Sequence, residues 1–257
     1  MSTPTLSDRP VVVITGASGG IGAALARHVA PTHALSLVAR RHAELQAVGD
    51  ELTAATGSPV LTITADVTSR GEVQRIVRET LAHFGRIDAW VNNVGQGITR
   101  MPSELTDDDI DDMMRINVKS ALYGMQEVLP HFMTAGRGHV VNVSSMLGRA
   151  PFALQRSAYS AAKHFLNALT ANFRTEVQST HPDIHVSLIS PGVVRTDFGL
   201  NARHGGVDSR ALPESQSADD VAAVIAAVLH DRRPDVYTRT GSAARIASAY
   251  ASIGVDP

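Results

Sequence analysis

The chain has 257 residues, of which 44% are hydrophobic and 19% are charged, and this balance excludes an intrinsically disordered protein. A formal net charge of -2 provides no basic field to attract nucleic acid or an anionic membrane surface. The absence of cysteine excludes disulfides, thiolate nucleophiles and cysteine-ligated metals.

The N-terminal segment bears on location. Residues Met1–Pro10 are polar and lack the apolar core of a signal peptide. No run in the chain approaches the ~20 apolar residues of a membrane helix. We therefore predict a soluble, cytoplasmic protein that binds neither nucleic acid nor membrane.

The first predicted strand, Val11–Ile14, leads directly into a glycine-rich turn, Thr15–Gly22, and then into an alanine-rich helix. Glycines let a backbone approach a pyrophosphate, and a helix N-terminus offers it N–H groups and a positive dipole. The alternative for such a cluster alone is a purely structural turn. We predict a dinucleotide site that includes Gly16, Ser18, Gly20, Ile21 and Gly22.

The second predicted strand, Ala34–Ala39, indicates which dinucleotide binds. An NAD site usually has an acid near this point for the ribose 2′-OH, but Ala39 stands there and Arg40 and Arg41 follow. Arginine suits a 2′-phosphate through charge-assisted hydrogen bonds. We predict preference for NADP(H), with Arg40 and the Ser18 hydroxyl on the phosphate. NAD(H) stays open, and the alternative for both arginines is a solvated helix start.

Five further strands are predicted at Val60–Thr64, Ile87–Asn92, His139–Val143, His185–Ile189 and Asp235–Thr238. Most are continuously apolar, as is typical of strands covered by helices on both faces. They alternate with helical patterns, which predicts βαβ units around a parallel sheet of seven strands with at least six helices. We predict one domain, residues 1–257.

Three helix starts carry a capping hydroxyl three residues before an acid, at Ser69–Glu72, Thr106–Asp109 and Ser217–Asp220. The first of these helices should end at Gly85 in a left-handed cap. The second should end at Asn117, which taken alone is more typical of a structural polar residue than of a catalytic one.

A predicted helix, Ser157–Gln178, carries Tyr159 and Lys163 one turn apart on one face. A phenol has a pKa near 10, and a nearby ammonium lowers it. Only two of the 23 Lys and Arg residues are lysines, Lys119 and Lys163, so a lysine here is informative. The alternative is that Tyr159 and Lys163 form a solvated pair on the surface.

The eleven histidines show no metal-ligand spacing, and we predict no metal site.

The ordered motifs resemble the short-chain dehydrogenase/reductase family, in its short single-domain branch, over Val11–Thr238. Thr15–Gly22 matches the family's cofactor turn, and Asn92–Gly95 matches its Asn-Asn-Ala-Gly segment with valine in place of alanine. The resemblance implies a Rossmann-type doubly wound α/β fold, a parallel seven-stranded sheet with helices on both faces. It also implies further cofactor contacts, at Asp66, Val67, Asn93, Tyr159, Lys163, Pro191, Gly192 and Thr196.

The same resemblance implies a catalytic tetrad of Asn117, Ser145, Tyr159 and Lys163, and hydride transfer between NADP(H) and a carbonyl or secondary alcohol substrate. Tyr159 would exchange a proton with the substrate oxygen, and Ser145 would hydrogen-bond it. Lys163 would lower the pKa of Tyr159 and hold the nicotinamide ribose. Asn117 would anchor a water that relays protons to Lys163.

The serine and the substrate pocket need separate arguments. The family's usual spacing to the tyrosine would select Met146, whereas Ser145 with Gly148 fits its serine–glycine pattern. We predict that Ser145 is the catalytic serine and that Arg149–Arg156 contains one additional residue.

The segment Arg149–Arg156 and the loop Asp197–Ser217 should form the substrate pocket. Candidates for an apolar wall are Phe152, Leu154, Phe198 and Leu200, and candidates to meet an acidic group are Arg203, His204 and Arg210. The alternative for each is an exposed lid residue.

Two other functions are weighed against this one. A non-catalytic NADP-binding regulator on the same fold would have no need for the tetrad. An extended-family epimerase or dehydratase would have a tighter glycine turn, and it would have a larger C-terminal domain than the ~60 residues after Pro191 provide.

The resemblance also bears on assembly. Family members commonly pair the helices matching Thr106–Phe132 and Ser157–Gln178, so we expect a homodimer or homotetramer.

Overall fold

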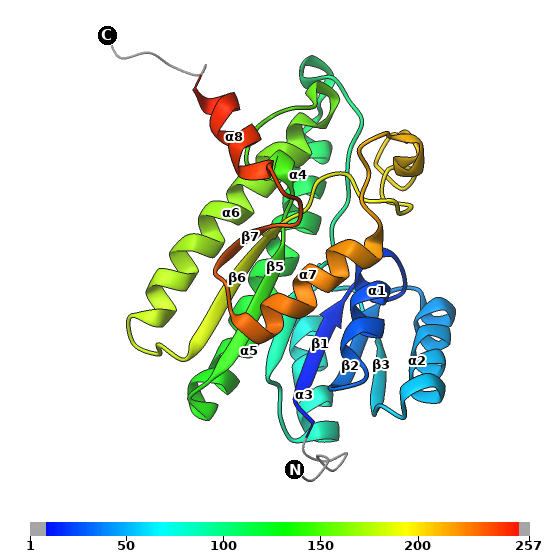
Figure 1. The fold of residues 1–257 in the computed structure, drawn as a ribbon, viewed down its shortest axis with the longest axis vertical. Coiled ribbons are helices and arrows are strands. Elements are labelled where there is room, and N and C mark those ends of the chain that lie inside the picture. The colour runs from blue at the N-terminus through cyan, green and yellow to red at the C-terminus, as the bar shows by residue number, and fades with distance from the viewer. Residues whose placement is uncertain (1–8, 252–257) are drawn as a thin grey trace.

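In the computed structural model the described residues are 9–251, so the segment Met1–Pro10 lies outside them except for its last two residues. The core of the molecule is a sheet of seven parallel strands in the order β3-β2-β1-β4-β5-β6-β7 (Figure 1). All seven predicted strands are confirmed, with ends within two residues of those expected. The strands are β1 (Val11–Thr15), β2 (Ala34–Ala39), β3 (Val60–Thr64), β4 (Ala89–Asn92), β5 (Gly138–Val143), β6 (Ile184–Ser190) and β7 (Asp235–Tyr237).

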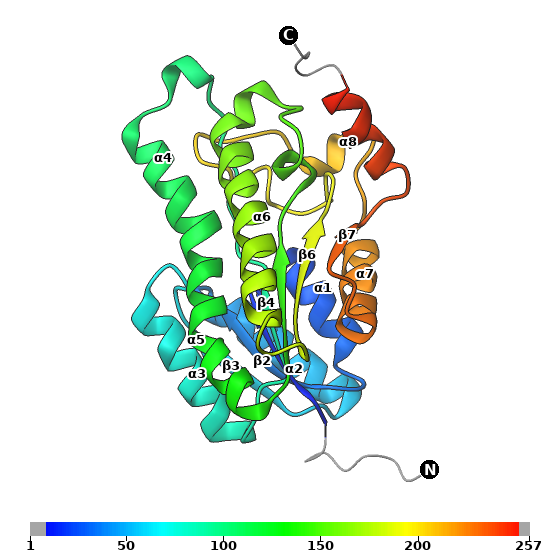
Figure 2. The same ribbon diagram turned by 90° about the vertical axis from the view of Figure 1, so that its left-hand side faces the viewer.

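Helices cover both faces of this sheet. Figure 2 shows α3, α4 and α5 on one side and α1 and α7 on the other. The strand residues alternate between two apolar layers, which explains why whole strands such as β1, β2 and β5 are buried. The helices are α1 (Gly20–Val29), α2 (His42–Thr56), α3 (Arg70–Phe84), α4 (Asp107–Met114), α5 (Ser120–Ala135), α6 (Ser157–Gln178), α7 (Ala218–Asp231) and α8 (Ser242–Tyr250).

Two of the three predicted helix caps form as expected. Thr106 before α4 and Ser217 before α7 each complete a capping box with the acid three residues later. The prediction for Ser69 was wrong in detail, because its side chain makes no cap hydrogen bond before α3. The Glu72 carboxylate instead accepts a 2.6 Å hydrogen bond from Arg75. The helix does end at Gly85, whose φ of 74° is left-handed.

The helix that begins after Thr106 does not end at Asn117. A π-helical stretch, Arg115–Lys119, joins α4 to α5, so the chain stays helical from Asp107 to Ala135. Such wider turns occur frequently at functional sites. Asn117 therefore lies in the middle of a long helical segment, where its buried side chain faces the loop after β4.

The strand order reverses between β1 and β4, so the connections leave these two neighbours in opposite directions. This is the topology of a Rossmann-type doubly wound sheet, and it opens a crevice at the carboxyl ends of the strands. The segment 197–217 and α8 lie at this end of the sheet (Figure 1). Within residues 9–251, no helix has the length and apolar character required to cross a membrane.

Candidate active site

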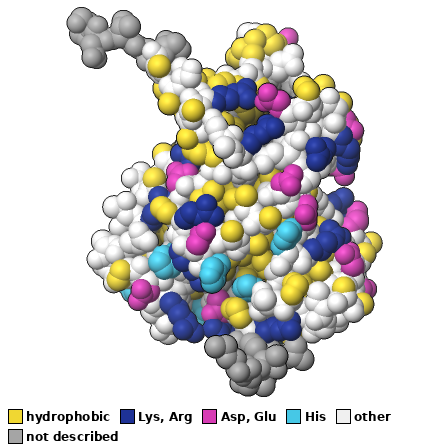
Figure 3. Space-filling view, viewed as in Figure 1, with side chains coloured by type: hydrophobic (Ala, Val, Ile, Leu, Met, Phe, Trp, Pro, Cys, Tyr) yellow, Lys and Arg dark blue, Asp and Glu magenta, His cyan; other side chains and the backbone are white. Residues whose placement is uncertain are grey.

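A cleft of about 1230 Å³ opens at the carboxyl ends of the strands. Pockets for single small ligands occupy roughly 300–1,000 Å³, so this cleft has room for a dinucleotide and a small substrate. Figure 3 shows a hollow on this end of the molecule, bordered by charged side chains. Nearly all predicted cofactor residues line the cleft: Gly16, Ser18, Gly20, Ile21, Arg40, Asp66, Val67, Asn93, Tyr159, Lys163, Pro191, Gly192 and Thr196. The exception is Gly22.

Gly22 does not line the cleft but packs directly against the backbone of the glycine turn. A Cβ on Gly22 would lie 2.3 Å from the carbonyl oxygen of Gly16, so no other residue fits without moving the turn. Gly16 itself has a φ of 70°, in the left-handed region that favours glycine. The turn delivers the N-terminus of α1 to the cleft, where its free N–H groups suit a pyrophosphate.

Thr15 and Asn93 fasten this turn to the loop after β4. The Asn93 backbone N–H donates to Thr15 Oγ1 at 3.0 Å, and Asn93 Nδ2 donates to the Thr15 carbonyl at 3.0 Å. Thr15 Oγ1 donates in turn to the Val91 carbonyl at 3.1 Å. The two loops that form the floor of the cleft are thus held in a fixed relation.

The adenosine end of the cleft carries both arginines that follow β2. The Ser18 hydroxyl accepts hydrogen bonds from Arg41, at 3.2 Å from Nε and 3.1 Å from Nη2. That Ser18 and Arg40 together hold a 2′-phosphate stays a prediction. Arg41 also lies 3.4 Å from Glu44. A Cβ on Gly19 would lie 3.0 Å from Arg41 Nη2, so the guanidinium fills the space beside the glycine turn.

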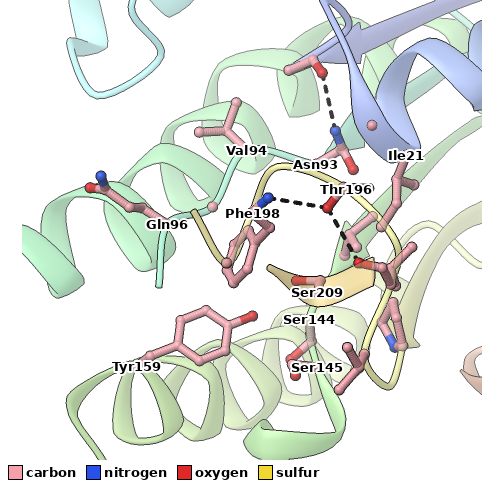
Figure 4. A pocket seen from close by; sticks show the side chains of 18 of the residues that line it. Ile21, Asn93, Val94, Gln96, Ser144, Ser145, Tyr159, Thr196, Phe198 and Ser209 are labelled. Atoms are coloured by element: carbon pink, nitrogen blue, oxygen red, sulfur yellow. Dashed lines mark hydrogen bonds between the residues drawn. The ribbon is translucent and has the colours of Figure 1, made fainter. Parts of the chain in front are cut away.

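Tyr159 and Lys163 extend from one face of α6 into the other end of the cleft. They are 6% and 3% exposed, so the alternative of a solvated surface pair is excluded. Lys163 Nζ donates to the Val143 carbonyl at 2.9 Å and lies 5.9 Å from the centre of the Tyr159 ring. The tyrosine hydroxyl points into the cleft (Figure 4).

Burial dominates the titration of both groups. It raises the pKa of Tyr159 to about 12, against the opposing effects of a hydrogen bond with Ser145 and the charge of Arg156. It also lowers the pKa of Lys163 to about 7, because a buried ammonium loses its hydration. The lowered tyrosine pKa expected from the neighbouring ammonium is therefore not found in the protein alone.

The two serines after β5 point to different partners. The Ser144 hydroxyl donates to Asn167 Oδ1 of α6 at 2.5 Å, so its proton is already used in a hydrogen bond within the protein. Ser145 Oγ accepts a hydrogen bond from the Leu147 N–H at 3.1 Å and interacts with the Tyr159 hydroxyl. The structure therefore brings Ser145, and not Ser144, to the tyrosine.

Asn117 is fully buried and does not line the cleft. Its Oδ1 accepts from the Gln96 N–H at 3.0 Å, and its Nδ2 donates to the Gln96 and Met113 carbonyls at 3.0 and 3.1 Å. A Cβ on Gly95 would lie 3.1 Å from Asn117 Oδ1 and 3.6 Å from Lys163 Nζ. Gly95, to which the sequence assigned no separate role, thus lets Asn117 and Lys163 flank the same loop.

The predicted apolar wall is half correct. Phe198 and Phe152 line the cleft, and the Phe198 ring packs edge-on against Tyr159 with ring centres 5.5 Å apart. Leu154 and Leu200 do not line it and are 63% and 49% exposed. Their side chains therefore match the alternative of exposed residues.

The three cations expected to meet an acidic group are also absent from the lining. Arg203 pairs with Asp109 and Asp112, and His204 lies 2.8 Å from Asp109. Arg210 pairs with Asp197 and Asp208. Carboxylates of the chain itself are thus the partners of these three side chains.

Arg156 lines the cleft instead. The sequence contains no signal for this residue beyond its place in the segment Arg149–Arg156.

Within the part of the chain that the structure describes, no group of three or more His, Cys, Asp or Glu side chains is arranged to hold a metal ion.

The sequence matches a family model described as short chain dehydrogenase over residues 10–205. It is 34% identical over 203 residues to the NADP-dependent 3-hydroxy acid dehydrogenase YdfG of Salmonella typhi, which covers 78% of this chain and 79% of the relative. It is 32% identical to an uncharacterized oxidoreductase of Staphylococcus epidermidis, over 74% of this chain and 82% of the relative. A short-chain dehydrogenase of Sphingobium yanoikuyae in complex with NADPH superposes with a TM-score of 0.82 at 29% identity, covering 95% of this chain and 93% of that one.

Proposed function

Because the chain belongs to the short-chain dehydrogenase/reductase family of oxidoreductases, we propose that it transfers hydride between NADP(H) and a small carbonyl or secondary alcohol substrate. The observation that carries this proposal is the meeting of Tyr159, Ser145 and Lys163 in the cleft that also contains the glycine turn. A binding protein has no need for a buried phenol beside a buried lysine, since burying an ammonium is unfavourable.

The residues present fit a dinucleotide. The glycine turn leaves a space that a Cβ would fill, and the helix N-terminus behind it suits a pyrophosphate. In this proposal Asp66 and Val67 hold the adenine end, and Arg40 and Arg41 hold the 2′-phosphate. Asn93, Pro191, Gly192, Thr196 and Lys163 hold the nicotinamide end. The NADP-dependent Salmonella relative and the NADPH complex from Sphingobium support this choice of cofactor.

When bound, the nicotinamide supplies or accepts the hydride. The proposed work of the chain is proton transfer and orientation. Tyr159 donates a proton to the carbonyl oxygen during reduction and accepts the alcohol proton during oxidation. Ser145 donates a hydrogen bond to the same oxygen and stabilises the charge that develops on it. Lys163, fixed by the Val143 carbonyl, favours the ionised form of Tyr159 whenever it is protonated.

Asn117 has a positioning role in this proposal. Its side chain bonds both the N–H and the carbonyl of Gln96 and does not line the cleft. The predicted water relay from Asn117 to Lys163 stays a prediction. Both ends of the cleft belong to one sheet, which supports the proposal of a single catalytic and cofactor-binding domain with a substrate loop at 197–217.

The proposed function is tested by a screen of carbonyls and alcohols against both nicotinamide cofactors, followed by nicotinamide absorbance. Tyr159→Phe removes only the hydroxyl, so we expect turnover to fall about a hundredfold or more while cofactor binding persists. Nicotinamide fluorescence measures that binding. Lys163→Arg should also fail, because the planar guanidinium is larger than the ammonium that the buried site encloses.

Two outcomes would contradict the proposal. Near-normal kcat for Tyr159→Phe would remove the tyrosine from the reaction. Cofactor binding without turnover on every substrate of the screen would favour the non-catalytic regulator instead.

A further inference from the structure

Arg156 places a positive charge at the substrate end of the cleft. It is the residue immediately before α6, three residues before Tyr159; both side chains line the cleft, and the charge of Arg156 acts on the Tyr159 hydroxyl. Its guanidinium is half-buried and Nη1 donates to the Ile98 carbonyl at 3.1 Å. A Cβ on Gly97 would lie 2.8 Å from Nη1, and one on Gly206 would lie 2.9 Å from Nη2. Two glycines thus make room for this guanidinium.

Among residues 9–251, no carboxylate lies within ion-pair distance of Arg156. The contrast with Arg239 and Arg245 is informative, because these line the same cleft and share Glu214 at 3.7 and 3.2 Å. The other acid at this end, Asp197, is paired with Arg210. Burial lowers the pKa of Arg156, because the guanidinium gives up part of its hydration.

We propose that Arg156 binds the carboxylate of the substrate, so that the substrate class is a small hydroxy acid or the corresponding oxo acid. This inference rests on the oxidoreductase function proposed above. The planar fork of a guanidinium matches a carboxylate with two parallel hydrogen bonds. Because Arg156 and Tyr159 line the same cleft and the charge of Arg156 acts on Tyr159, a carboxylate held by Arg156 would lie beside the reacting carbon. Phe198, which packs against Tyr159, covers the carbon chain between them.

A purely structural role for Arg156 makes a different prediction. If the guanidinium served only to hold the Ile98 carbonyl, its removal would affect charged and neutral substrates equally. Matched pairs of a hydroxy acid and its methyl ester separate the two roles, because only the charge differs at the end of the molecule that faces Arg156.

The test measures kcat/KM with NADP for lactate and 3-hydroxybutanoate, each beside its methyl ester. We expect the wild type to prefer at least one acid over its ester. Arg156→Gln should lower that preference about ten- to a hundredfold, the range for a charge-assisted hydrogen bond, mainly through KM. Arg156→Lys should retain part of it. Arg245→Gln is the matched control and should leave it unchanged, since Arg245 has Glu214 as its partner.

Inhibition provides a second readout that needs no turnover of the probe. Butanoate should compete with the acid substrate in the wild type and lose this effect in Arg156→Gln, whereas inhibition by butanamide should stay the same. Equal losses for acid and ester in Arg156→Gln would overturn the inference, as would a wild type that prefers every ester. Either result, obtained with active enzyme, would leave the oxidoreductase function standing. A wild type that turns over no carbonyl or alcohol would overturn both.

Discussion

Tyr159 and Lys163 show how far burial controls the chemistry of single residues in this protein. Both lie on α6 and are enclosed, so each side chain favours its neutral form. The tyrosine therefore keeps its proton, which the proposed reaction would transfer to a carbonyl oxygen. For the lysine, burial means that the protein carries an ionisable amine whose pKa lies close to neutral pH. The charge of Lys163 therefore changes with pH near neutrality.

This arrangement predicts a pH-dependent stability difference for Lys163→Met. Below pH 7 the lysine is charged in both the folded and the unfolded state, so the wild type carries the full cost of a buried ammonium. Between pH 7 and about 10.4 the unfolded chain binds more protons than the folded one, so wild-type stability rises with pH relative to the variant. We expect any advantage of Lys163→Met to shrink across this range.

Denaturant unfolding of the cofactor-free proteins at pH 6.5 to 10 measures this difference. Lys119→Met, which removes an exposed lysine, controls for the loss of the side chain itself. A difference between wild type and Lys163→Met that stays constant over the range would show that Lys163 keeps its proton in the folded protein.

A second prediction at this scale concerns the two arginines after β2. Arg40→Ala should raise KM for NADP about ten- to a hundredfold, because charge-assisted hydrogen bonds contribute roughly 1.5–3 kcal/mol. Arg41→Ala should raise it at least as much, because Ser18 and Glu44 already hold its guanidinium in the cleft. KM for NAD should stay nearly unchanged in both.

Ala39→Asp completes this set, because a carboxylate at the end of β2 would repel the 2′-phosphate and bond the free 2′-OH of NAD. We expect it to reverse the cofactor preference, measured as kcat/KM for both cofactors. If the wild type favours NAD, or if both arginine variants keep unaltered NADP kinetics, Arg40 and Arg41 are solvated surface charges that do not bind the 2′-phosphate.

At the scale of elements, two carboxylates of α4, Asp109 and Asp112, fasten the loop 197–217 to this helix, and only Asp109 is fully buried. Asp109 is fully buried, completes the capping box with Thr106, and pairs with Arg100 at 2.9 Å, Arg203 at 2.7 Å and His204 at 2.8 Å. The Ile98 segment runs beside Arg203 and shares a backbone bridge with it. The same loop carries Phe198 to Tyr159, so the position of the substrate pocket depends on a contact outside it.

Asp109→Ala should therefore destabilise the protein and loosen the substrate loop together. Removing one partner of a buried ion pair costs about 3 kcal/mol at the lower end, which corresponds to a fall in Tm of roughly 6–12 °C. The hydrogen bond with His204, followed by those from Thr106 and Arg100, holds the pKa of Asp109 well below its usual range. Its stabilising effect is thus present above about pH 4 and is lost as the pH falls through the folded-state pKa.

Thermal unfolding at pH 7 and below pH 4 tests this, with Asp108→Ala as the control for an exposed acid in the same helical turn. The gap in Tm between wild type and Asp109→Ala should narrow at the lower pH. Equal Tm losses for the two alanine variants at pH 7 would argue that the buried ion pairs contribute nothing specific.

At the scale of the whole molecule, the cleft lies at one end of the sheet, and the outer face of α5 and α6 remains free of covering elements (Figure 2). A groove on this face is lined by Leu122, Leu129 and Leu169 among others. Phe165 lies one turn before Leu169 on α6 and is 50% exposed. The groove also contains polar side chains such as Arg70, Glu127 and Glu176. An exposed aromatic ring beside such a mixed groove fits an interface between copies of a chain.

We therefore expect a homodimer or homotetramer that pairs this face across a two-fold axis. Phe165→Glu should shift the assembly towards smaller species, because it introduces a charge where two apolar faces would meet. Leu200→Glu, an equally exposed position on the substrate loop, is the control. Light scattering at micromolar concentration measures both, and a wild type that scatters as a 27.2 kDa monomer would contradict the expectation.

The sequence predicted most of the local structure, although the expected Ser69 cap does not form and the expected helix end at Asn117 is absent. Hydrophobic period and glycine position predicted the seven strands, the turn Thr15–Gly22 and the helix that carries Tyr159 and Lys163, because these patterns act over a few neighbouring residues. The four-residue spacing of Tyr159 and Lys163 fixes their common face in any helix. It does not reveal how deeply both are buried, and burial is what determines their pKa values.

The tertiary structure alone decided which polar groups meet. Neighbouring residues in an extended chain point to opposite sides, so only the packing of α6 against β5 determines that Ser145 faces the tyrosine while Ser144 faces Asn167. Likewise, nothing in the sequence separates Arg203, His204, Arg210 and Arg156 as candidates to meet an acidic group. Contacts with α4, far away in the chain, bring Arg203 and His204 to Asp109, acids within the loop pair with Arg210, and Arg156 is left in the cleft, because an ion pair depends on distance in space.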